Sequence, residues 1–332
     1  MTTRPQLTSD ATDGSRYPRD TMLPPPVITF AIPYHRNIDY LLEAVASVRA
    51  QTISNWELVI VDDCGPDDAS VIIAGLGDNR IRYLRNEANL GLASNWNECL
   101  RQSTTALVTL LHSDDRLLPG YGAAVLSAAG RHPDTAAFFT DASIIGSDGA
   151  PARSLPDFVK RFAHRPRRDH QVAGDTDLAS VLANNYIFCP TLCYRASLVG
   201  TAPFDPRWSF VVDLDHVTRL LLAGRQLWGI RSPLYEYRRH ASNQTSLLTA
   251  DATRFAEEIA LYREVATAAK ATGWRHSARA ARHRTMVRMH LVLQVANDAL
   301  HARFTPAREK QLMLWNDLRG DRQHDRPRGR SV

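Results

Sequence analysis

The sequence predicts an α/β fold: a Rossmann-like, mainly parallel mixed sheet flanked by helices, followed by a helical C-terminal extension. Two observations carry this prediction. Short, continuous apolar runs alternate with segments of helical apolar spacing in the first half of the chain, as in successive βαβ units. Continuous apolar runs are typical of strands that a parallel sheet buries on both faces. From about residue 251 to residue 318 the spacing is helical throughout.

The elements follow in chain order. Residues 1–26 are polar and end in three consecutive prolines, a composition that predicts a disordered tail. Apolar runs then predict strands at Val27–Ile32, Trp56–Val61, Ile81–Leu84, Leu107–Leu111, Phe138–Thr140, Ala142–Ile145 and Trp228–Tyr237. Helical spacing predicts helices at Tyr40–Ala50, Leu92–Gln102 and Asp213–Ala223. We expect Pro33 to end the first strand and Gly224 to cap the last of these helices.

Length and composition indicate one large domain with an appendage. The chain has 332 residues, of which 44% are hydrophobic, and this is ample for a sizeable core. We expect the α/β domain over residues 27–245, the helical extension over 246–318 and a basic disordered tail over 319–332. Apolar residues between Trp274 and Phe304 keep helical spacing. The basic, proline-interrupted stretch Lys160–His170 predicts a mobile loop that meets an acidic or phosphate-bearing acceptor.

Charge and cysteine content exclude several classes of protein. The formal charge of +5 is mild, so no nucleic-acid partner is expected. The four cysteines lack the spacing of a disulfide framework or a zinc site. No apolar run approaches the roughly 18–20 residues of a membrane span, and the N-terminus lacks the apolar core of a signal peptide. We therefore expect a cytoplasmic protein, with any membrane contact peripheral and at the inner face.

The extension carries basic residues beside its apolar stripe, and this pattern has two interpretations. It is consistent with contact to an anionic membrane surface, but such a stripe more often packs on the domain itself or on a second subunit in a homo-oligomer. The residues concerned are Arg275, Arg279, Arg282, Arg284 and Arg288.

Polar groups follow three of the predicted strands: Pro33-Tyr34-His35-Arg36, Asp62-Asp63 and His112-Ser113-Asp114-Asp115. The carboxyl ends of parallel strands share one edge of a sheet, where open α/β folds bind their ligands. Carboxylate oxygens suit Mg²⁺ or Mn²⁺, which usually share their coordination shell with substrate phosphates. Neither a dinucleotide-binding glycine motif nor a P-loop is present. The pattern therefore predicts a nucleotide-sugar site, although Asp114 and Asp115 would also serve simply to open a loop.

Taken in order, these motifs resemble glycosyltransferase family 2, the inverting nucleotide-diphospho-sugar transferases of GT-A fold. The resemblance covers about residues 27–245. It rests on Ser47 and Gln51 of a Ser-x-x-x-Gln pattern, Glu57–Asp63, Asn89–Leu92 with Asn95-Trp96-Asn97, Leu111–Pro119, Asp213-Leu214-Asp215 with Arg219-Leu220, and Tyr237-Arg238-Arg239-His240.

The resemblance implies a role for each matching residue. Asp213 is expected as the general base that takes the proton of the acceptor hydroxyl, although aspartate is also a common helix N-cap. A divalent metal, Mn²⁺ or Mg²⁺, is expected on Asp114, Asp115 and His240. Nucleotide contacts are expected from Pro33, Tyr34, Arg36, Asp62, Asp63, Asn95 and Ser113. Further candidates are His112, Asp215, Arg238 and Arg239.

The sequence departs from the family pattern at several of these positions. His112 stands where the first aspartate of Asp-x-Asp is usual, which leaves one carboxylate fewer for the metal. Val212 replaces the usual glutamate before the catalytic aspartate. Tyr34-His35-Arg36 replaces the usual Thr-Tyr-Asn, and Cys64-Gly65-Pro66 replaces the customary Gly-Ser.

The expected activity is transfer of a sugar from a nucleotide-diphosphate donor, UDP-linked in the first instance, to a hydroxyl of a glycan or lipid-linked acceptor with inversion. Such an enzyme would serve cell-wall or polysaccharide biosynthesis. Two alternatives stay open: a non-catalytic relative that binds sugar nucleotides or a partner transferase, and a sugar nucleotidyltransferase. The second lacks its glycine-rich basic loop after the first strand.

Overall fold

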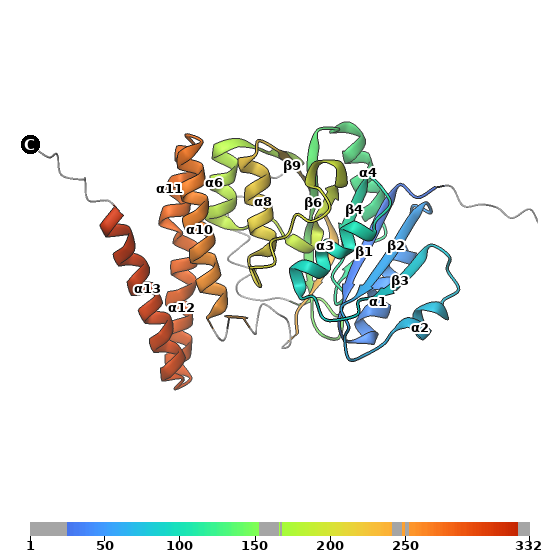
Figure 1. Ribbon diagram of the computed structural model, residues 1–332, viewed down its shortest axis with the longest axis horizontal. Helices are drawn as coiled ribbons and strands as arrows, with labels where there is room; N and C mark the ends of the chain where they lie inside the picture. Colours follow the sequence, from blue (N-terminus) through green and yellow to red (C-terminus); the bar gives the residue numbers. More distant parts are fainter. Residues whose placement is uncertain (1–24, 153–165, 167, 241–247, 250–251, 325–332) are drawn as a thin grey trace, which may run out of the picture.

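The computed structural model describes residues 25–152, 166, 168–240, 248–249 and 252–324, with side chains described to residue 319. Most of the two predicted tails, and most of the predicted loop Lys160–His170, lie outside the described residues. Figure 1 shows an α/β body followed by a group of long C-terminal helices.

The first part of the chain alternates strands with helices: β1 (Ile28–Tyr34), α1 (Ile38–Arg49), β2 (Trp56–Asp62), α2 (Ser70–Ala74), β3 (Ile81–Arg85), α3 (Leu92–Gln102) and β4 (Leu107–Leu110). The middle part comprises β5 (Arg116–Leu117), α4 (Tyr121–Arg131), β6 (Thr135–Ile145), β7 (His170–Val172), α6 (Gly174–Asn184), the 3₁₀ helix η1 (Cys189–Thr191), β8 (Cys193–Arg195) and α7 (Ala196–Val199). The last part comprises α8 (Val212–Leu222), β9 (Gln226–Arg238), α10 (Thr253–Ala271), α11 (Arg275–His283), α12 (Thr285–Leu300) and α13 (Phe304–His324).

A single mixed sheet organises the α/β body, in the strand order β3-β2-β1-β4-β8-β6-β9-β5, with β7 paired to β9. The first four strands in this order are mutually parallel. β8 is antiparallel to both β4 and β6, and β9 is parallel to β6. The predicted mainly parallel mixed sheet is confirmed. The carboxyl ends of β1, β2 and β4 therefore meet at one edge.

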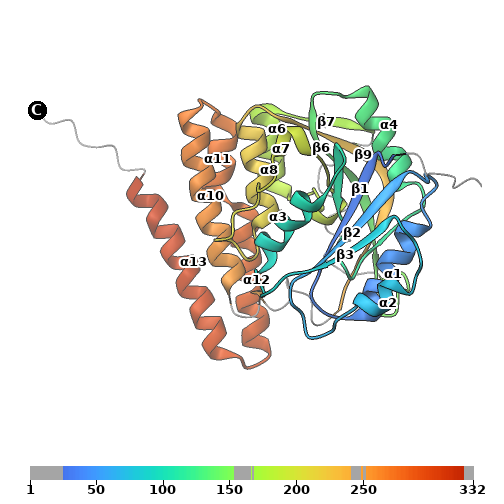
Figure 2. The ribbon, with the colours of Figure 1, turned by 45° about the vertical axis from the view of Figure 1, so that its right-hand side comes forward.

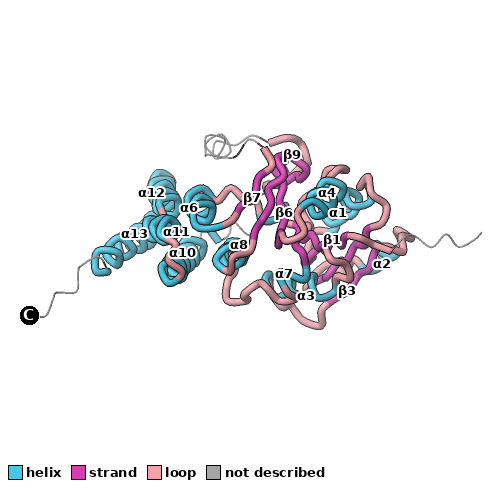
Figure 3. The backbone as a smooth tube through the Cα atoms, turned by 90° about the horizontal axis from the view of Figure 1, so that it is seen from above, coloured by secondary structure: helices cyan, strands magenta, loops and turns pink. Residues whose placement is uncertain are grey.

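Each face of the sheet is covered by its own apolar core. Side chains of α1, α2 and α4 pack on one face, and side chains of α3, α6 and α8 pack on the other. Figure 3 shows the sheet between α1 and α4 on one side and α3 on the other. This double cover explains why the central strands are apolar at successive positions.

The C-terminal helices continue the second core. Phe255, Ile259 and Tyr262 of α10 are buried in the same cluster as α3, α6 and α8, and the Tyr262 hydroxyl donates to the Leu182 carbonyl of α6 at 2.7 Å. Figure 2 shows α10 and α11 beside α6 and α8, with α13 outermost. The predicted helical extension is thus present and is packed directly on the α/β body.

Three details of the predicted elements are wrong. β1 continues through Pro33 to Tyr34, because Pro33 lies beyond Ala31, the last residue of β1 that pairs with β4. The two predicted strands between residues 138 and 145 are one strand, β6, with register shifts on either side of Asp141. The apolar series from Trp274 to Phe304 is divided among three helices by left-handed residues at Arg284 and Ala302.

α13 also runs to His324, past the residue 318 at which the extension was predicted to end. Among the helices that the structure describes, none is both long enough and apolar enough to cross a membrane.

Candidate active site

The candidate site lies at the carboxyl edge of the sheet, where the segment after β4 meets the end of β9. Short β5 pairs antiparallel with β9, so that Arg116 lies opposite Glu236 and Leu117 opposite Tyr235. This pairing holds residues 112–115 against the residues that end β9. Segments more than a hundred residues apart in the sequence thereby form one site.

Asp115 joins the two segments. Its side chain is fully buried. Its Oδ1 accepts the backbone N–H of Arg238 at 2.7 Å, and its Oδ2 accepts the hydroxyl of Tyr235 at 2.8 Å. Burial, together with the neighbouring charge of Asp114, raises the pKa of Asp115 well above the usual range. Both oxygens of Asp115 therefore have internal partners, and the carboxylate that reaches outward is Asp114.

Asp114 is partly exposed and lies beside two histidines. Its Oδ2 is 2.9 Å from Nε2 of His240. Burial favours the neutral carboxyl, but the hydrogen bond from His240 and the charge of His112 outweigh burial and lower the pKa of Asp114. The side chain therefore presents a carboxylate at neutral pH.

His112, Asp114 and Asp115 form a group that fits a divalent cation. One ligand atom from each lies within 4.8 Å of those of the other two. Burial lowers the pKa of His112, and among the described residues its Nε2 has no hydrogen-bond partner. A neutral imidazole with an unused nitrogen, next to a carboxylate, is the donor chemistry of a transition-metal site. The imidazole is a softer ligand than the usual aspartate and favours Mn²⁺ over Mg²⁺ here.

Asp213 lies in the first turn of α8, as the resemblance predicts. Burial raises the pKa of Asp213, against the backbone N–H groups of Leu214 and Asp213 and the thiol of Cys189, which interact with the carboxylate. Burial also raises the pKa of Cys189 well above its usual range, and the charges of Asp213 and Asp115 act in the same direction. Cys189 thus lies within electrostatic reach of both aspartates, and Asp213 neighbours the carboxylate cluster.

The sequence gives no indication of a role for Cys189. The residue begins η1, in a segment without a recognisable motif, and only the folded chain brings its thiol to Asp213.

A glutamate of the extension holds the segment that leads into α8. Glu257 of α10 accepts the backbone N–H groups of Ser209, Phe210 and Val211, at distances between 2.7 and 3.2 Å. The neighbouring Glu258 is buried and receives Nε of Arg254 at 3.1 Å. Burial raises the pKa of Glu258, and the charge of Asp213 adds to that shift. The C-terminal extension therefore contacts the turn that presents Asp213.

The aspartates after β2 are buried and have internal partners. Asp62 accepts the Gly65 backbone N–H at 2.9 Å and hydrogen-bonds Tyr83 and Arg85. Its turn requires glycine at position 65, because a Cβ there would lie 1.6 Å from the carbonyl oxygen of His35.

Asp63 holds the loop that precedes α3. Its carboxylate accepts backbone N–H groups of Leu90 and Gly91 at 2.7 and 2.9 Å and the side chain of Asn86 at 3.0 Å. Asn95 also bonds Asn86, and it donates to the carbonyl of Val61 at 3.1 Å. In this structure these three candidate nucleotide contacts shape the rim of the site.

The remaining nucleotide candidates belong to the same edge. Tyr34 is fully buried, and burial with the nearby charges of Asp67 and Asp62 raises its pKa to about 12. Pro33 and Ser113 are half-buried, and Arg36 is exposed just beyond β1.

Arg238 is fully buried and stabilises the junction. Its Nε donates to the Asp114 carbonyl at 2.7 Å and its Nη1 to the Ser147 carbonyl at 3.1 Å, and the guanidinium pairs with Glu43. Its plane lies 4.4 Å from the ring of Tyr40. These contacts assign Arg238 to the internal structure of the site.

Asp215 and Arg239 differ in position from Asp213. The Asp215 carboxylate is buried and accepts Nε and Nη2 of Arg219 at 2.9 and 2.7 Å. This pair lies within α8 and supports the helix. Arg239 is half-buried, and its backbone N–H donates to the Ile145 carbonyl at 2.9 Å.

Solved structures of similar fold place this arrangement in a known class. The chain is similar to S. aureus TarS 1–349, solved in complex with UDP-GlcNAc, with a TM-score of 0.57 and 16% identity over 72% of this chain and 66% of that one. At this identity the likeness shows the fold, a GT-A α/β fold with a helical C-terminal region.

Sequence comparison gives the family. Residues 29–182 match the family described as Glycosyl transferase family 2. The chain is 34% identical to the uncharacterized protein MT1568 of Mycobacterium tuberculosis over 59% of its own length and 62% of that protein. It is 27% identical to TuaG of Bacillus subtilis, a putative teichuronic acid biosynthesis glycosyltransferase, over 64% of its own length and 79% of that protein.

The chain belongs to glycosyl transferase family 2. The family match contains both aspartate pairs and ends in α6, before Asp213. The chain spans less than two thirds of the length of MT1568 and of the TarS chain.

Proposed function

We propose that this protein transfers a sugar from a nucleotide-diphosphate donor, UDP-linked in the first instance, to a hydroxyl of a glycan or lipid-linked acceptor, with inversion at the anomeric carbon. Family membership supports the reaction class. The similarity to TuaG and to TarS, whose names and titles refer to polysaccharide biosynthesis and to UDP-GlcNAc, supports the choice of donor and acceptor classes. The proposed place of action is the cytoplasm, at the inner face of the membrane.

The donor diphosphate is proposed to bind at the group formed by His112, Asp114 and His240. A divalent cation held there by His112 and Asp114 would neutralise the charge that grows on the leaving diphosphate. Asp115 keeps this group in place through its bonds to β9. His240, at 2.9 Å from Asp114, is placed to meet the phosphates or the cation.

Asp213 is proposed to act on the acceptor side. In an in-line displacement a single carboxylate takes the proton of the attacking hydroxyl, and no covalent intermediate is needed. Burial raises the pKa of Asp213, and this makes its carboxylate a stronger proton acceptor than an exposed aspartate. The observation that carries the proposal is this arrangement: a raised-pKa carboxylate in the first turn of α8, linked through Cys189 to the aspartate pair.

The test is a panel of nucleotide sugars, each screened with Mn²⁺ or Mg²⁺ for thermal stabilisation and then for turnover with glycan and lipid-linked acceptors. Ligands that bind the native state raise its stability according to their concentration over Kd, so slow turnover does not hide the donor. We expect one donor to give a metal-dependent shift. Absence of any such shift across the panel would contradict the proposal.

Asp213→Asn separates an enzyme from a non-catalytic sugar-nucleotide-binding relative. We expect this variant to keep donor binding and to lose turnover by roughly a thousandfold, the contribution of a positioned general base. A wild-type chain that binds donor but never turns over would favour the binding relative. Release of pyrophosphate from a nucleoside triphosphate and a sugar phosphate would reveal a nucleotidyltransferase.

A further inference from the structure

The turn between α12 and α13 exposes large apolar side chains. Leu300, the last residue of α12, is 84% exposed, and Phe304, the first residue of α13, is 70% exposed. Single exposed apolar residues are ordinary, but these two lie on one turn. The turn forms the lower end of the helical group in Figures 1 and 2, beyond α10 and α11. We call residues 299–308 the hairpin tip.

The hairpin tip is held rigidly in this exposed arrangement. Asp298 is buried and pairs with the buried Lys310 and with Arg303, at 2.8 and 2.9 Å. The Asp298 carbonyl also accepts the backbone N–H of Arg303 at 2.8 Å. A buried ion pair that spans the turn fixes how the two helices meet, so Leu300 and Phe304 cannot turn inward without breaking it.

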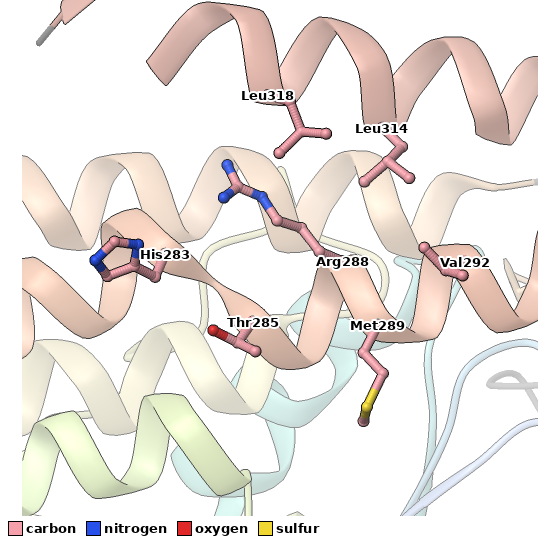
Figure 4. Close-up of a pocket in the computed structure, with 7 residues that line it drawn as sticks. All are labelled: His283, Thr285, Arg288, Met289, Val292, Leu314 and Leu318. Carbon is pink, nitrogen blue, oxygen red and sulfur yellow. The ribbon is translucent and has the colours of Figure 1, made fainter. Parts of the chain in front are cut away.

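The apolar surface continues from the tip along both helices. On α12 the exposed residues Met289, Val292 and Leu293 precede Leu300 at helical spacing. Between α12 and α13 lies an open, mostly apolar groove of about 350 Å³. Figure 4 shows Leu314 and Leu318 of α13 pointing toward α12 across this groove. An apolar surface of this extent is the mark of an interaction site.

The charges beside this surface are mainly positive. Residues 275–319 contain nine Lys or Arg residues and three acidic residues. Two of the acidic residues, Asp298 and Asp317, are buried in ion pairs, which leaves Glu309 as the exposed one. At the tip itself, His301, Arg303 and Arg308 are exposed beside the two apolar side chains. Farther along α13, Arg319 lies over the half-exposed ring of Trp315 at 4.5 Å.

The structure also changes which basic residues can take part. Arg284 and Arg288, two of the five predicted for membrane contact, bind the buried Asp317 at 2.8 and 2.9 Å. Their charges stabilise the helix pair from within, because Asp317 would otherwise be a buried, unpaired carboxylate. Any basic contact surface of the extension must therefore use other cations.

We propose that the hairpin tip docks on an anionic lipid surface, with Leu300 and Phe304 entering the interface and Arg303 and Arg308 contacting the headgroups. Charge complementarity favours this occupant over a second copy of the chain, because pairing two tips would bring their arginines together without acidic partners. Apolar burial and headgroup attraction are the two contributions that hold interfacial helices on membranes. This proposal does not depend on the transferase activity.

The test is cosedimentation of the full chain with vesicles of phosphatidylcholine alone and of phosphatidylcholine mixed with phosphatidylglycerol. We expect binding to the mixed vesicles only. Leu300→Ser with Phe304→Ser should reduce that binding by roughly a hundredfold, from the lost apolar burial of two side chains. Arg303→Gln with Arg308→Gln should reduce it by about tenfold or more and remove its salt dependence.

The matched control is Val71→Ser with Ile72→Ser. These residues are 82% and 41% exposed on α2, in the α/β body, and should leave vesicle binding unchanged. Thermal melting checks that each variant is folded. Binding that survives the loss of Leu300 and Phe304, or equal binding to both vesicle types, would overturn the proposal. So would a dimer in solution that the tip variant dissociates, since the apolar surface would then face a second copy.

Discussion

At the residue scale, adjacent aspartates have different surroundings and therefore different expected roles. Asp114 and Asp115 share one loop, yet only Asp115 is fully buried, with both oxygens bonded to β9. Asp114 keeps its carboxylate partly exposed beside His112 and His240. Sequence adjacency cannot distinguish the two, because the difference depends on a strand more than a hundred residues away.

We expect Asp114→Asn to abolish the metal-dependent thermal shift with a nucleotide-sugar donor while leaving the free energy of unfolding almost unchanged. Asp115→Asn should instead lower the free energy of unfolding by about 1–3 kcal/mol, since an amide nitrogen would face a backbone donor in a buried site. Denaturant titration and the donor-induced shift measure the two effects separately. Equal losses of stability in both variants would contradict the distinction.

The acidity of Asp213 gives a prediction for the pH dependence of turnover. Burial raises its pKa, and the base must be ionised to accept a proton, so kcat/KM should rise with pH through a value above the ~3.9 of an ordinary aspartate. Cys189→Ala removes an interaction that lowers this pKa and should move the acidic limb to higher pH, whereas Cys189→Ser should move it less. An unchanged acidic limb in Cys189→Ala would exclude the thiol from this role.

At the element scale, the start of α8 depends on α10. Helix N-termini leave backbone N–H groups without partners inside the helix, and no side-chain cap is present at Val211 of α8. Glu257 supplies the missing acceptor from a neighbouring helix. The same kind of contact joins α6 to α11, where Asp175 accepts the backbone N–H groups of His276 and Ser277.

Glu257→Ala should lower kcat by about tenfold with little change in KM for the donor, because loosening residues 209–211 misplaces Asp213. The free energy of unfolding should fall by about 1 kcal/mol, as for the loss of a helix cap. Glu257→Gln keeps one acceptor oxygen and should recover part of kcat. The control is Glu264→Ala on the same helix, which removes only an exposed pair with Arg207. If both alanine variants lower kcat equally, the effect is general destabilisation.

At the scale of the whole molecule, the extension and the α/β body share one core. Buried side chains of α10 lie in the same cluster as those of α3, α6 and α8. Removing the extension would expose several large apolar side chains, each of which contributes about 1.5–3 kcal/mol when buried. That loss is comparable with the whole stability of a typical domain, roughly 5–15 kcal/mol.

A chain truncated after residue 251 should therefore lose cooperative thermal unfolding and precipitate. A chain that lacks only residues 325–332 serves as the control and should melt like the full chain. Circular dichroism in the near and far ultraviolet measures both. A truncated chain with an unchanged melting temperature would show that the α/β body folds alone.

The sequence by itself determined the fold class, the parallel strands, the shared carboxyl edge and the family, because burial on both faces of a sheet imposes apolar runs and the polar groups follow those runs directly. Strand alternation and motif order are local properties that the chain carries in register. What only the tertiary structure decided is the function of individual polar side chains. Whether Asp62, Asp63, Asp215 or Arg238 faces a ligand or an internal partner depends on contacts between distant segments. Cys189 and Glu257 reach the site for the same reason, since folding alone brings η1 and α10 to the first turn of α8.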